Sequence, residues 1–255
     1  LRNLLMPFDI ASIRQTTGVA PPFMIVYGTS GVGKTTFCSQ APKPIFIQTE
    51  AGEGLLTLSA FPIAKSFDDV LSAIETLIIE DNDFETLVID SLDHLEPLIW
   101  QLVCTEQGVD SIEKIGYQKG YTFALDHWRK LVRAITTLRS KKNMAVVLIA
   151  HTHIRKHESP VSDTYDRYEI KLHHKAASYM QESADAVLFA SHKIITKKED
   201  KGFGQHRVRG MSTGERRLCC SEKPGFIAKN RYGLPDEIDL SWAAFQESFT
   251  QSIEG

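Results

Sequence analysis

FMIVYGTSGVGKTT, residues 23–36, joins a short apolar run to a glycine-rich loop that ends in a lysine and two threonines. From Gly28 to Thr35 it fits the pattern G-x-x-x-x-G-K-[ST] in full, between a β-type run and a plausible helix, which is the context of a phosphate-binding loop. Glycines let the backbone curl so that successive N–H groups converge on phosphate oxygens. The positive end of the following helix adds to this attraction. The stretch therefore predicts a protein that binds a nucleoside triphosphate.

The same loop assigns chemical roles to single side chains. Lys34 is expected to reach the β- and γ-phosphates, and the Thr35 hydroxyl to ligate Mg²⁺. Asp90 ends the apolar run at 87–89, where a carboxylate can hold Mg²⁺ as a Walker B residue. The alternative for Asp90 is an acid that merely caps the next helix. The residues expected to bind nucleotide are Gly28, Thr29, Ser30, Gly31, Val32, Gly33, Lys34, Thr35 and Thr36.

Charged residues at two other places can serve hydrolysis. Glu50 closes the run at 45–50, where a carboxylate can orient the water that attacks the γ-phosphate. Glu53 is the nearby competitor, and an exposed loop acid is the plain alternative. Lys229 and Arg231 are two residues apart and share one side of an extended segment. We expect them to approach a triphosphate on a neighbouring subunit, as an arginine finger does; an ordinary surface pair is the alternative.

His151 ends the apolar run at 145–150. A neutral imidazole there can hydrogen-bond the γ-phosphate and report hydrolysis to the segment that follows. His151 and His153 would also share one face of a strand, so a metal pair is a second interpretation. The spacing fixes no third ligand, for which the candidates are His157, His173 and His174.

Predicted strands and helices alternate along the chain, which indicates an α/β fold with a mainly parallel sheet flanked by helices. The fully apolar run at 145–150 suits a parallel strand that is buried on both faces. After residue 190 the pattern is β-rich, with a turn at Ser212-Thr-Gly214 and a strand at 226–228, and we expect an extension of the same sheet. The other strands are predicted at 23–28, 45–47, 86–90 and 186–190, and the helices near 70–78, 92–107 and 128–138.

Length and composition bound the remaining possibilities. The 255 residues, 42% of them hydrophobic, are at the upper limit of one domain. We expect a peripheral N-terminal arm over 1–20, one nucleotide-binding domain over 21–245 and a C-terminal tail over 246–255. No run approaches the length of a membrane span, and the start of the chain has no signal pattern. Four cysteines without C-x-x-C spacing fit reduced thiols, so a cytoplasmic protein without a membrane partner is expected.

The net charge of −3 conceals a basic segment. Residues 191–231 carry eleven Lys and Arg against four acids, whereas the last 24 residues carry five acids and neither Lys nor Arg. This distribution favours a polyanion or a subunit interface as the partner of the basic segment. A solvated hairpin is the alternative.

In combination, these motifs resemble the RecA/RadA recombinase superfamily. The phosphate-binding loop, a strand ending in Glu50, the Val-Ile-Asp-Ser run at 88–91 and a strand ending in His151 occur in the order of that superfamily. Lys229-Asn-Arg-Tyr-Gly233 resembles the trans-acting Lys/Arg pair of RecA-like hexameric helicases. The stretches that look like the phage-type nucleotide-binding proteins, a group that includes RecA-like single-strand annealing proteins, are 165–168, 172–175, 214–216 and 228–235.

The resemblance covers roughly 21–245 and implies a RecA-like P-loop ATPase core that uses ATP and Mg²⁺. By position, Glu50 is the catalytic glutamate and His151 stands where RecA has a glutamine. A trans-acting pair implies a homo-oligomer with nucleotide at the subunit interface. The residues expected to be catalytic are Lys34, Glu50, His151, Lys229 and Arg231.

The two DNA-binding loops of the RecA core correspond to 108–121 and 152–175. Aromatic residues interleaved with cations suit the stacking of bases and the tracking of phosphates. The second loop is nearly charge-balanced, so avidity along an oligomer would have to add to its affinity; a mobile surface loop without a partner is the alternative. The residues expected to bind DNA are Tyr117, Lys119, Arg155, Lys156, Arg167, Tyr168, Lys171 and Lys175.

The preferred interpretation is a Mg²⁺-dependent, DNA-stimulated ATPase that acts on single-stranded DNA in phage-type recombination or annealing. Its expected setting is the cytoplasm of a phage-infected or prophage-carrying bacterial cell, with a single-strand DNA-binding protein as a further partner. The alternative is a RecA-type helicase motor or a helicase loader, although the β-rich 186–231 disfavours the helical lid of a loader. A small-molecule kinase is disfavoured because the cations lie on β-type segments.

Overall fold

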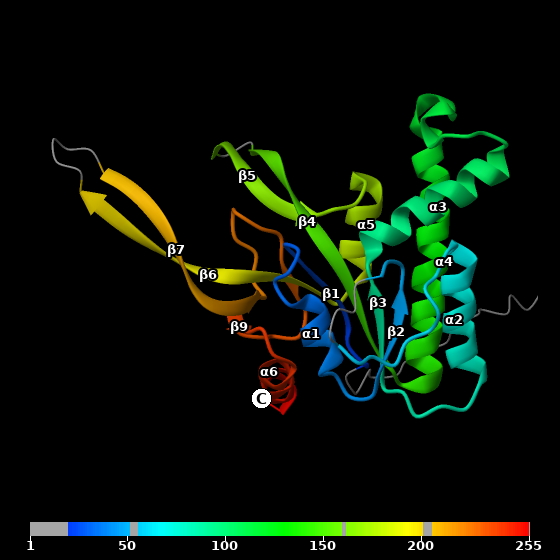
Figure 1. Ribbon diagram of the computed structural model, residues 1–255, viewed down its shortest axis with the longest axis horizontal. Helices are drawn as coiled ribbons and strands as arrows, with labels where there is room; N and C mark the ends of the chain where they lie inside the picture. The colour runs from blue at the N-terminus through cyan, green and yellow to red at the C-terminus, as the bar shows by residue number, and fades with distance from the viewer. Residues whose placement is uncertain (1–19, 52–55, 160–161, 201–205, 255) are drawn as a thin grey trace, which may run out of the picture.

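A mixed β-sheet forms the centre of the protein (Figure 1). The computed structural model describes residues 20–51, 56–159, 162–200 and 206–254. Within these residues the sheet has nine strands in the order β2-β3-β4-β1-β6-β7-β9, with β5 paired to β4 and β8 paired to β6. The strands are β1 Phe23–Gly28, β2 Pro44–Gln48, β3 Thr86–Asp90, β4 Ala145–Ser159, β5 Ser162–Ile170, β6 Ala186–Asp200, β7 His206–Cys219, β8 Lys229–Asn230 and β9 Glu237–Asp239.

Five of these strands are parallel to one another, in the order β2, β3, β4, β1 and β6. The apolar side chains of their central segments, such as 146–150 of β4 and 186–190 of β6, are buried on both faces of the sheet, as their continuous hydrophobic runs predict. The register sets Gly28 opposite His151 on one side and Ala190 on the other, and Asp90 opposite Gln48. The carboxyl ends of β1 to β4 therefore meet at one edge, where a ligand of an open α/β sheet is expected to bind.

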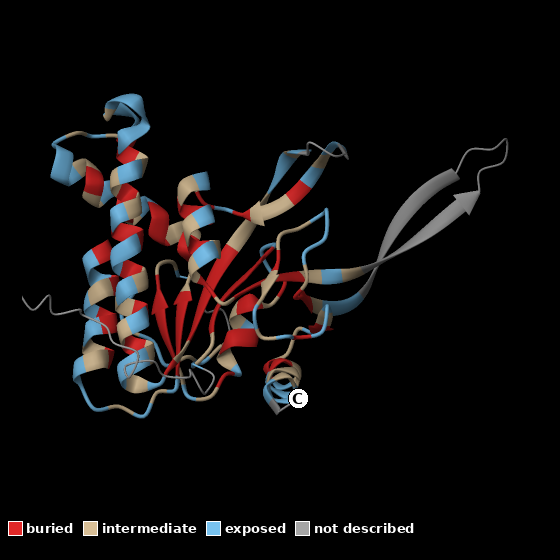
Figure 2. Ribbon diagram, turned by 180° about the vertical axis from the view of Figure 1, so that it is seen from behind, coloured by how far each residue is buried: buried red, intermediate tan, exposed pale blue. Residues whose placement is uncertain are grey.

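Helices cover both faces of the sheet. The helices α2 to α5 pack on one face through residues such as Trp128 and Met180, and α1 and α6 pack on the other through Phe37, Trp242 and Phe245. Figure 2 shows the buried central strands between these partly exposed helices. The helices are α1 Lys34–Ser39, α2 Phe67–Ile79, α3 Leu92–Gln107, α4 Lys119–Lys142, α5 His174–Ser183 and α6 Trp242–Glu254, with short 3₁₀ turns at Ile112–Lys114 and Gly116–Gln118.

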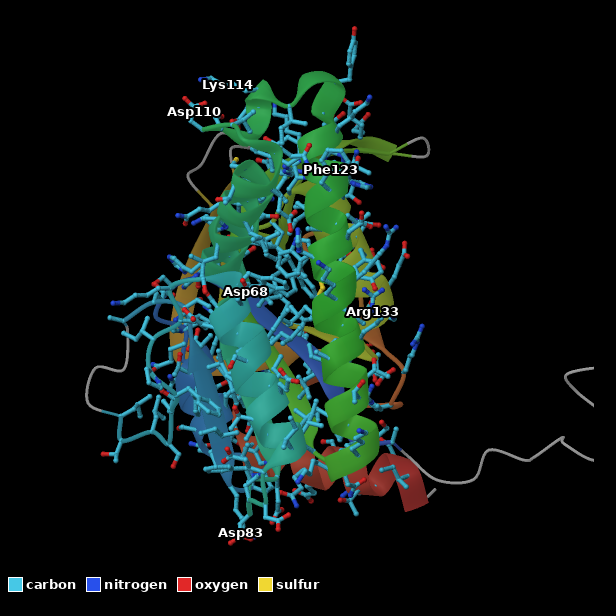
Figure 3. The ribbon with its side chains drawn as sticks, turned by 90° about the vertical axis from the view of Figure 1, so that its right-hand side faces the viewer. Asp68, Asp83, Asp110, Lys114, Phe123 and Arg133 are labelled. Atoms are coloured by element: carbon cyan, nitrogen blue, oxygen red, sulfur yellow. The ribbon has the colours of Figure 1, made fainter. Side chains whose placement is uncertain are left out.

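The outer layer is made by α2 and α4, which lie side by side in Figure 3. Asp68 of α2 and Arg133 of α4 are exposed, whereas Val70 and Ile135 face the sheet and are buried. A capping box starts α2, because the Ser66 hydroxyl accepts from the Asp69 main-chain N–H and the Asp69 carboxylate accepts from that of Ser66. Among the described residues, no helix is both long enough and apolar enough to cross a membrane.

The β-rich end of the chain extends the same sheet, as predicted, but its turn was placed wrongly. Strand β7 runs through Ser212 and Gly214 without turning back. The register between β6 and β7 shifts there, so that three residues of β7 (213–215) lie opposite Lys193 alone. Gly214 has a φ of 81°, and it marks this irregularity, not a hairpin turn. The strand predicted at 226–228 is also displaced, because β8 begins at Lys229.

The segment 152–175 was predicted as a loop, and most of it is a two-stranded antiparallel ribbon. Strand β4 continues beyond the sheet core to Ser159, and β5 returns alongside it, with Thr152 opposite Ile170 and Lys156 opposite Asp166. Polar residues paired across two strands satisfy their backbone hydrogen bonds, which a solvated loop would leave to water. The ribbon stands beside the carboxyl edge of the sheet in Figure 1.

Helix α6 crosses the predicted boundary between the domain and its C-terminal tail. The boundary at 245/246 falls inside α6, and Phe249 packs edge-on against Tyr232 with ring centroids 5.0 Å apart. Aromatic residues spaced one turn apart keep this helix on the domain. Residues 1–19, most of the predicted arm, and Glu53 lie outside the described residues.

Candidate nucleotide-binding site

A cavity of about 680 Å³ opens at the carboxyl edge of the sheet. Its wall is formed by the phosphate-binding loop, the ends of β2, β3 and β4, and a residue of β7. The lining residues are Ser30, Gly31, Gly33, Lys34, Thr35, Thr36, Gln48, Glu50, Leu56, Asp90, His94, His151, Lys171 and Arg216. The structure thus brings much of the phosphate-binding loop together with Glu50, Asp90 and His151, which were predicted from separate segments of the sequence.

The backbone of the loop requires its glycines. Gly31 and Gly33 have φ values of 76° and 105°, which side-chain-bearing residues rarely adopt. At Gly28 the constraint is spatial, because an added Cβ would collide with the main-chain oxygen of Ala190 on β6. The loop therefore leaves an open backbone cradle whose N–H groups suit phosphate oxygens.

Lys34 is buried, and its ammonium donates to the main-chain oxygens of Gly28 and Thr29 at 3.1 and 3.0 Å. Burial lowers the pKa of Lys34, while the carboxylates of Asp90, Asp93 and Glu50 act in the opposite direction. The cation is therefore held at the base of the loop, close to where a bound phosphate would lie.

The residues expected to ligate Mg²⁺ are in contact. The Thr35 hydroxyl donates to Asp90 Oδ2 at 2.7 Å. Burial raises the pKa of Asp90, against the hydrogen bond from Thr35. Hydroxyl and carboxylate oxygens are hard ligands of the kind that Mg²⁺ prefers, so this pair fits the ion. Thr35 and Asp90 would hold Mg²⁺, which would neutralise phosphate charge.

The end of β2 is tied to the end of β3. The Thr49 hydroxyl accepts from the main-chain N–H of Ser91 at 2.9 Å and donates to its main-chain oxygen at 2.8 Å. Next along the chain, Glu50 Oε1 lies 3.0 Å from His94 Nδ1 and 3.4 Å from the Ser91 hydroxyl. This arrangement places the Glu50 carboxylate on the cavity wall, across from the loop that carries Lys34.

His151 is fixed by a buried carboxylate on α3. The Asp93 side chain is 2% exposed; Oδ1 accepts from the His151 main-chain N–H at 2.9 Å, and Oδ2 lies 2.9 Å from His151 Nδ1. Burial alone would raise the pKa of Asp93, but the hydrogen bonds and charge of His151 outweigh it and hold that pKa well below its usual range. The carboxylate orients the imidazole and leaves Nε2 as its remaining polar atom.

The metal pair considered for His151 and His153 is not what the structure brings together. Ligand atoms of Glu50, His94 and His151 lie within 4.8 Å of one another. His153 instead carries a buried Nε2 without a hydrogen-bond partner, and burial lowers its pKa. His173, one of the candidates for a third ligand, stacks on Tyr121 at a centroid distance of 3.9 Å.

Lys229 and Arg231 lie away from the cavity of their own chain. Lys229 pairs with Val187 at the beginning of β6, the end of the sheet opposite the phosphate-binding loop. Its ammonium donates to the main-chain oxygens at the end of α5, at 2.6 to 2.8 Å, and Arg231 Nη1 is 3.4 Å from Asp185. Within one chain the pair does not reach the nucleotide site, and its action on a neighbouring subunit stays a prediction.

The predicted DNA-binding residues fall into two groups. Arg167 is buried and paired with Glu222, and Tyr168 stacks on Phe189 with centroids 5.2 Å apart, so both support the ribbon from within. Tyr117 is 96% exposed at the tip above α4. The side chains of the other candidates are exposed or, for Lys175, partly exposed; these candidates are Lys119, Arg155, Lys156, Lys171 and Lys175.

Three site residues escaped the sequence-based assignment. Asp93 and His94 come soon after the Walker B run in the sequence. The closeness of a second carboxylate to Asp90 could have identified them. Arg216 was noted only within a stretch of resemblance. It reaches the loop because β7 lies two strands from β1, a pairing that no local pattern reveals.

Comparisons with known proteins bear on this site. The family model described as an AAA domain matches residues 20–232, most of the chain. Among solved structures, the chain is similar to one described as the RadB recombinase, with 13% identity and a TM-score of 0.47 over 89% of this chain and 91% of that chain. No curated protein matches the sequence. The chain belongs to the AAA domain family, and it has the predicted α/β fold, in which helices flank a mainly parallel sheet.

Proposed function

We propose that this protein is a Mg²⁺-dependent ATPase that acts on single-stranded DNA as a homo-oligomer, in phage-type recombination or strand annealing. ATP binds at the phosphate-binding loop, Glu50 orients the attacking water, and DNA runs along the exposed cations of the β4–β5 ribbon. The resemblance of the stretches at 165–168 and 228–235 favours the annealing group and its phage setting.

One observation supports the proposed coupling between the nucleotide site and the DNA-binding surface. His151 lines the nucleotide cavity, and Arg155 and Lys156 are exposed four and five residues later on the same uninterrupted strand, β4. The returning strand β5 leads directly to Lys171, which lines the cavity again and lies 4.0 Å from Asp93. A change at the γ-phosphate therefore has a short, hydrogen-bonded route to the proposed DNA-binding surface.

Hydrolysis is supported by the groups around the loop. Lys34 and the Thr35–Asp90 pair can neutralise phosphate charge, while Glu50 offers a carboxylate to the attacking water. The decisive experiment measures phosphate release with Mg-ATP, with and without single-stranded DNA, across a protein titration. Stimulation by DNA that grows with protein concentration supports the proposal. Turnover indifferent to both would contradict it, and separation of forked duplexes would favour a helicase.

Replacing Arg155 and Lys156 together with alanine should remove most of the DNA stimulation and leave basal ATP turnover unchanged. Each lost phosphate contact on a single strand flattens the dependence of log K on log[salt] by about 0.7, so the double variant should lose about 1.4 in slope. Fluorescence anisotropy with a labelled oligonucleotide over a salt series measures this change.

The matched control replaces Lys130 and Arg133, two exposed cations of α4, and removes the same charge. Arg133 is labelled on this helix in Figure 3. The control variant should bind DNA like wild type. Equal loss in both double variants would show that binding follows net charge only, and the ribbon assignment would then be wrong.

We expect Lys229 to stabilise the fold and Arg231 to act on a neighbouring subunit. Lys229→Met removes three charge-assisted hydrogen bonds at the end of α5 and should lower the free energy of unfolding by about 1–3 kcal/mol. Arg231→Ala, at a largely exposed ion pair, should cost less than about 1 kcal/mol. Denaturant unfolding measures both.

The ATPase titration tests the trans role separately. Arg231→Ala should abolish the rise of turnover per subunit with protein concentration, because that rise reflects a shared site. Retention of the full concentration dependence in Arg231→Ala would exclude it as an arginine finger.

A further inference from the structure

The structure places an arginine of β7 against the phosphate-binding loop of the same chain. Arg216 Nη1 donates to the main-chain oxygen of Val32 at 3.4 Å. A Cβ added at Gly33 would lie 2.5 Å from the same Nη1, so the guanidinium stands directly over the Gly33 backbone. Arg216 also lines the cavity that contains Lys34 and Glu50.

The fold aims this side chain at the loop. Within β7, side chains alternate between the two faces of the sheet, and Leu218 is buried among Val32 and Phe37 on the face that α1 covers. Arg216 is two residues before Leu218 and so shares that face. Its neighbour Arg217 shares the other face with Cys219, which belongs to the opposite core.

The backbone of Arg216 is held on both sides. It lies opposite His192 in β6, and its main-chain oxygen accepts from the Leu240 N–H at 3.1 Å. The register irregularity at 213–215 immediately precedes it. An irregularity of this kind re-aims the side chains that follow, which is a common device beside functional sites.

The charges around Arg216 leave its cation available. Within the described part of the chain, no carboxylate forms an ion pair with Arg216, whereas Arg217 Nη1 lies 2.8 Å from Glu237 Oε2. An arginine presents a planar fork of donors that matches phosphate oxygens. A cation aimed at a phosphate-binding loop and lacking an acidic partner is suited to an anionic ligand.

We propose that Arg216 is a nucleotide ligand supplied in cis, and that its guanidinium binds the α- or β-phosphate of the bound nucleotide. The loop main chain beside Val32 and Gly33 belongs to the cradle for these phosphates, while Lys34 reaches the β- and γ-phosphates. Glu50 and His151 approach from β2 and β4, on the other side of the loop from β7. Arg216 therefore binds ATP and ADP alike. This inference rests on the proposed use of the loop for ATP.

The test is equilibrium binding of ribose-labelled fluorescent ATP and ADP to the full chain in Mg²⁺, without DNA. Arg216→Ala should weaken both nucleotides by a similar factor, roughly 10- to 100-fold, which corresponds to loss of a charge-assisted hydrogen bond. In turnover assays, KM for ATP should rise by that factor, while kcat at saturation should stay within about threefold of wild type, because the contact is equal in ground and transition states.

Arg217→Ala is the matched control, since it removes the same charge from the adjacent position on the opposite face; it should bind both nucleotides like wild type. Thermal unfolding verifies that each variant is folded. Arg216→Ala with wild-type affinity for both nucleotides would overturn the inference, and so would weakening of ATP with ADP unaffected. Lys34→Ala separates the two proposals: if it leaves nucleotide binding intact, the use of the loop for ATP is itself wrong.

Discussion

Replacing Glu50 with glutamine should lower ATP turnover by about 10²- to 10⁴-fold, the usual contribution of a general base. Glutamine keeps the size and the hydrogen-bonding ability of the side chain but cannot accept a proton from water. Glu50 is well placed for this role because it lines the cavity and is steadied by His94 and Ser91. Binding of ATP should stay within about threefold of wild type, since Glu50 acts on water and not on the phosphates.

Glu75→Gln is the control, because Glu75 is exposed on α2, away from the cavity. Single-turnover phosphate release with saturating enzyme measures the chemical step directly. If Glu50→Gln hydrolyses ATP at the wild-type rate, the base is another carboxylate, and Glu53→Gln is then the variant to measure.

Glu96→Gln should remove the contribution of Glu96 to the pH dependence of stability, which is expected between pH 4.5 and about 7. Glu96 of α3 is buried and accepts from the His173 main-chain N–H through both oxygens, at 3.0 Å each. Burial raises its pKa to about 7, against those hydrogen bonds. The folded protein therefore binds a proton that the unfolded chain has already lost over this range.

Proton linkage determines whether the free energy of unfolding rises or falls with pH. Between pH 4.5 and 7 the folded state holds more protons at Glu96, so the free energy of unfolding decreases as pH rises and levels off above 7. The total decrease is about 3 kcal/mol, since each pKa unit is worth about 1.4 kcal/mol. The difference in unfolding free energy, Glu96→Gln minus wild type, should thus increase by about 3 kcal/mol over that range.

Urea unfolding at a series of pH values measures this difference, and Glu75→Gln should show the wild-type profile throughout. A constant difference between Glu96→Gln and wild type at all pH values would mean that Glu96 titrates in the folded protein as it does in the unfolded chain. Glu96 ties α3 to His173, the residue that precedes α5.

Local patterns were sufficient for the loop and for the ends of the buried strands. A glycine at a φ of 76° or 105° and a polar residue after an apolar run are constraints within a few consecutive residues. The sequence therefore predicts that Gly31, Gly33, Lys34 and Asp90 belong to one site, and the structure places them in one cavity. The α/β class and the sheet extension followed from the same patterns. The ribbon at 152–170 was missed because its strands are mostly polar and exposed, so they show no regular alternation of apolar and polar residues.

Contacts between segments far apart in the chain depended on the tertiary structure. Asp93 and His151 are 58 residues apart in the sequence, and Lys229 is 45 residues from Ala184, whose main-chain oxygen it binds at the end of α5. Arg216 and Val32 are 184 residues apart. Each contact depends on strand order and register, which are set by packing of the whole sheet and not by any stretch of sequence. The amino-acid order thus specified the chemistry of the phosphate-binding loop, whereas the fold selected which distant side chains complete its site.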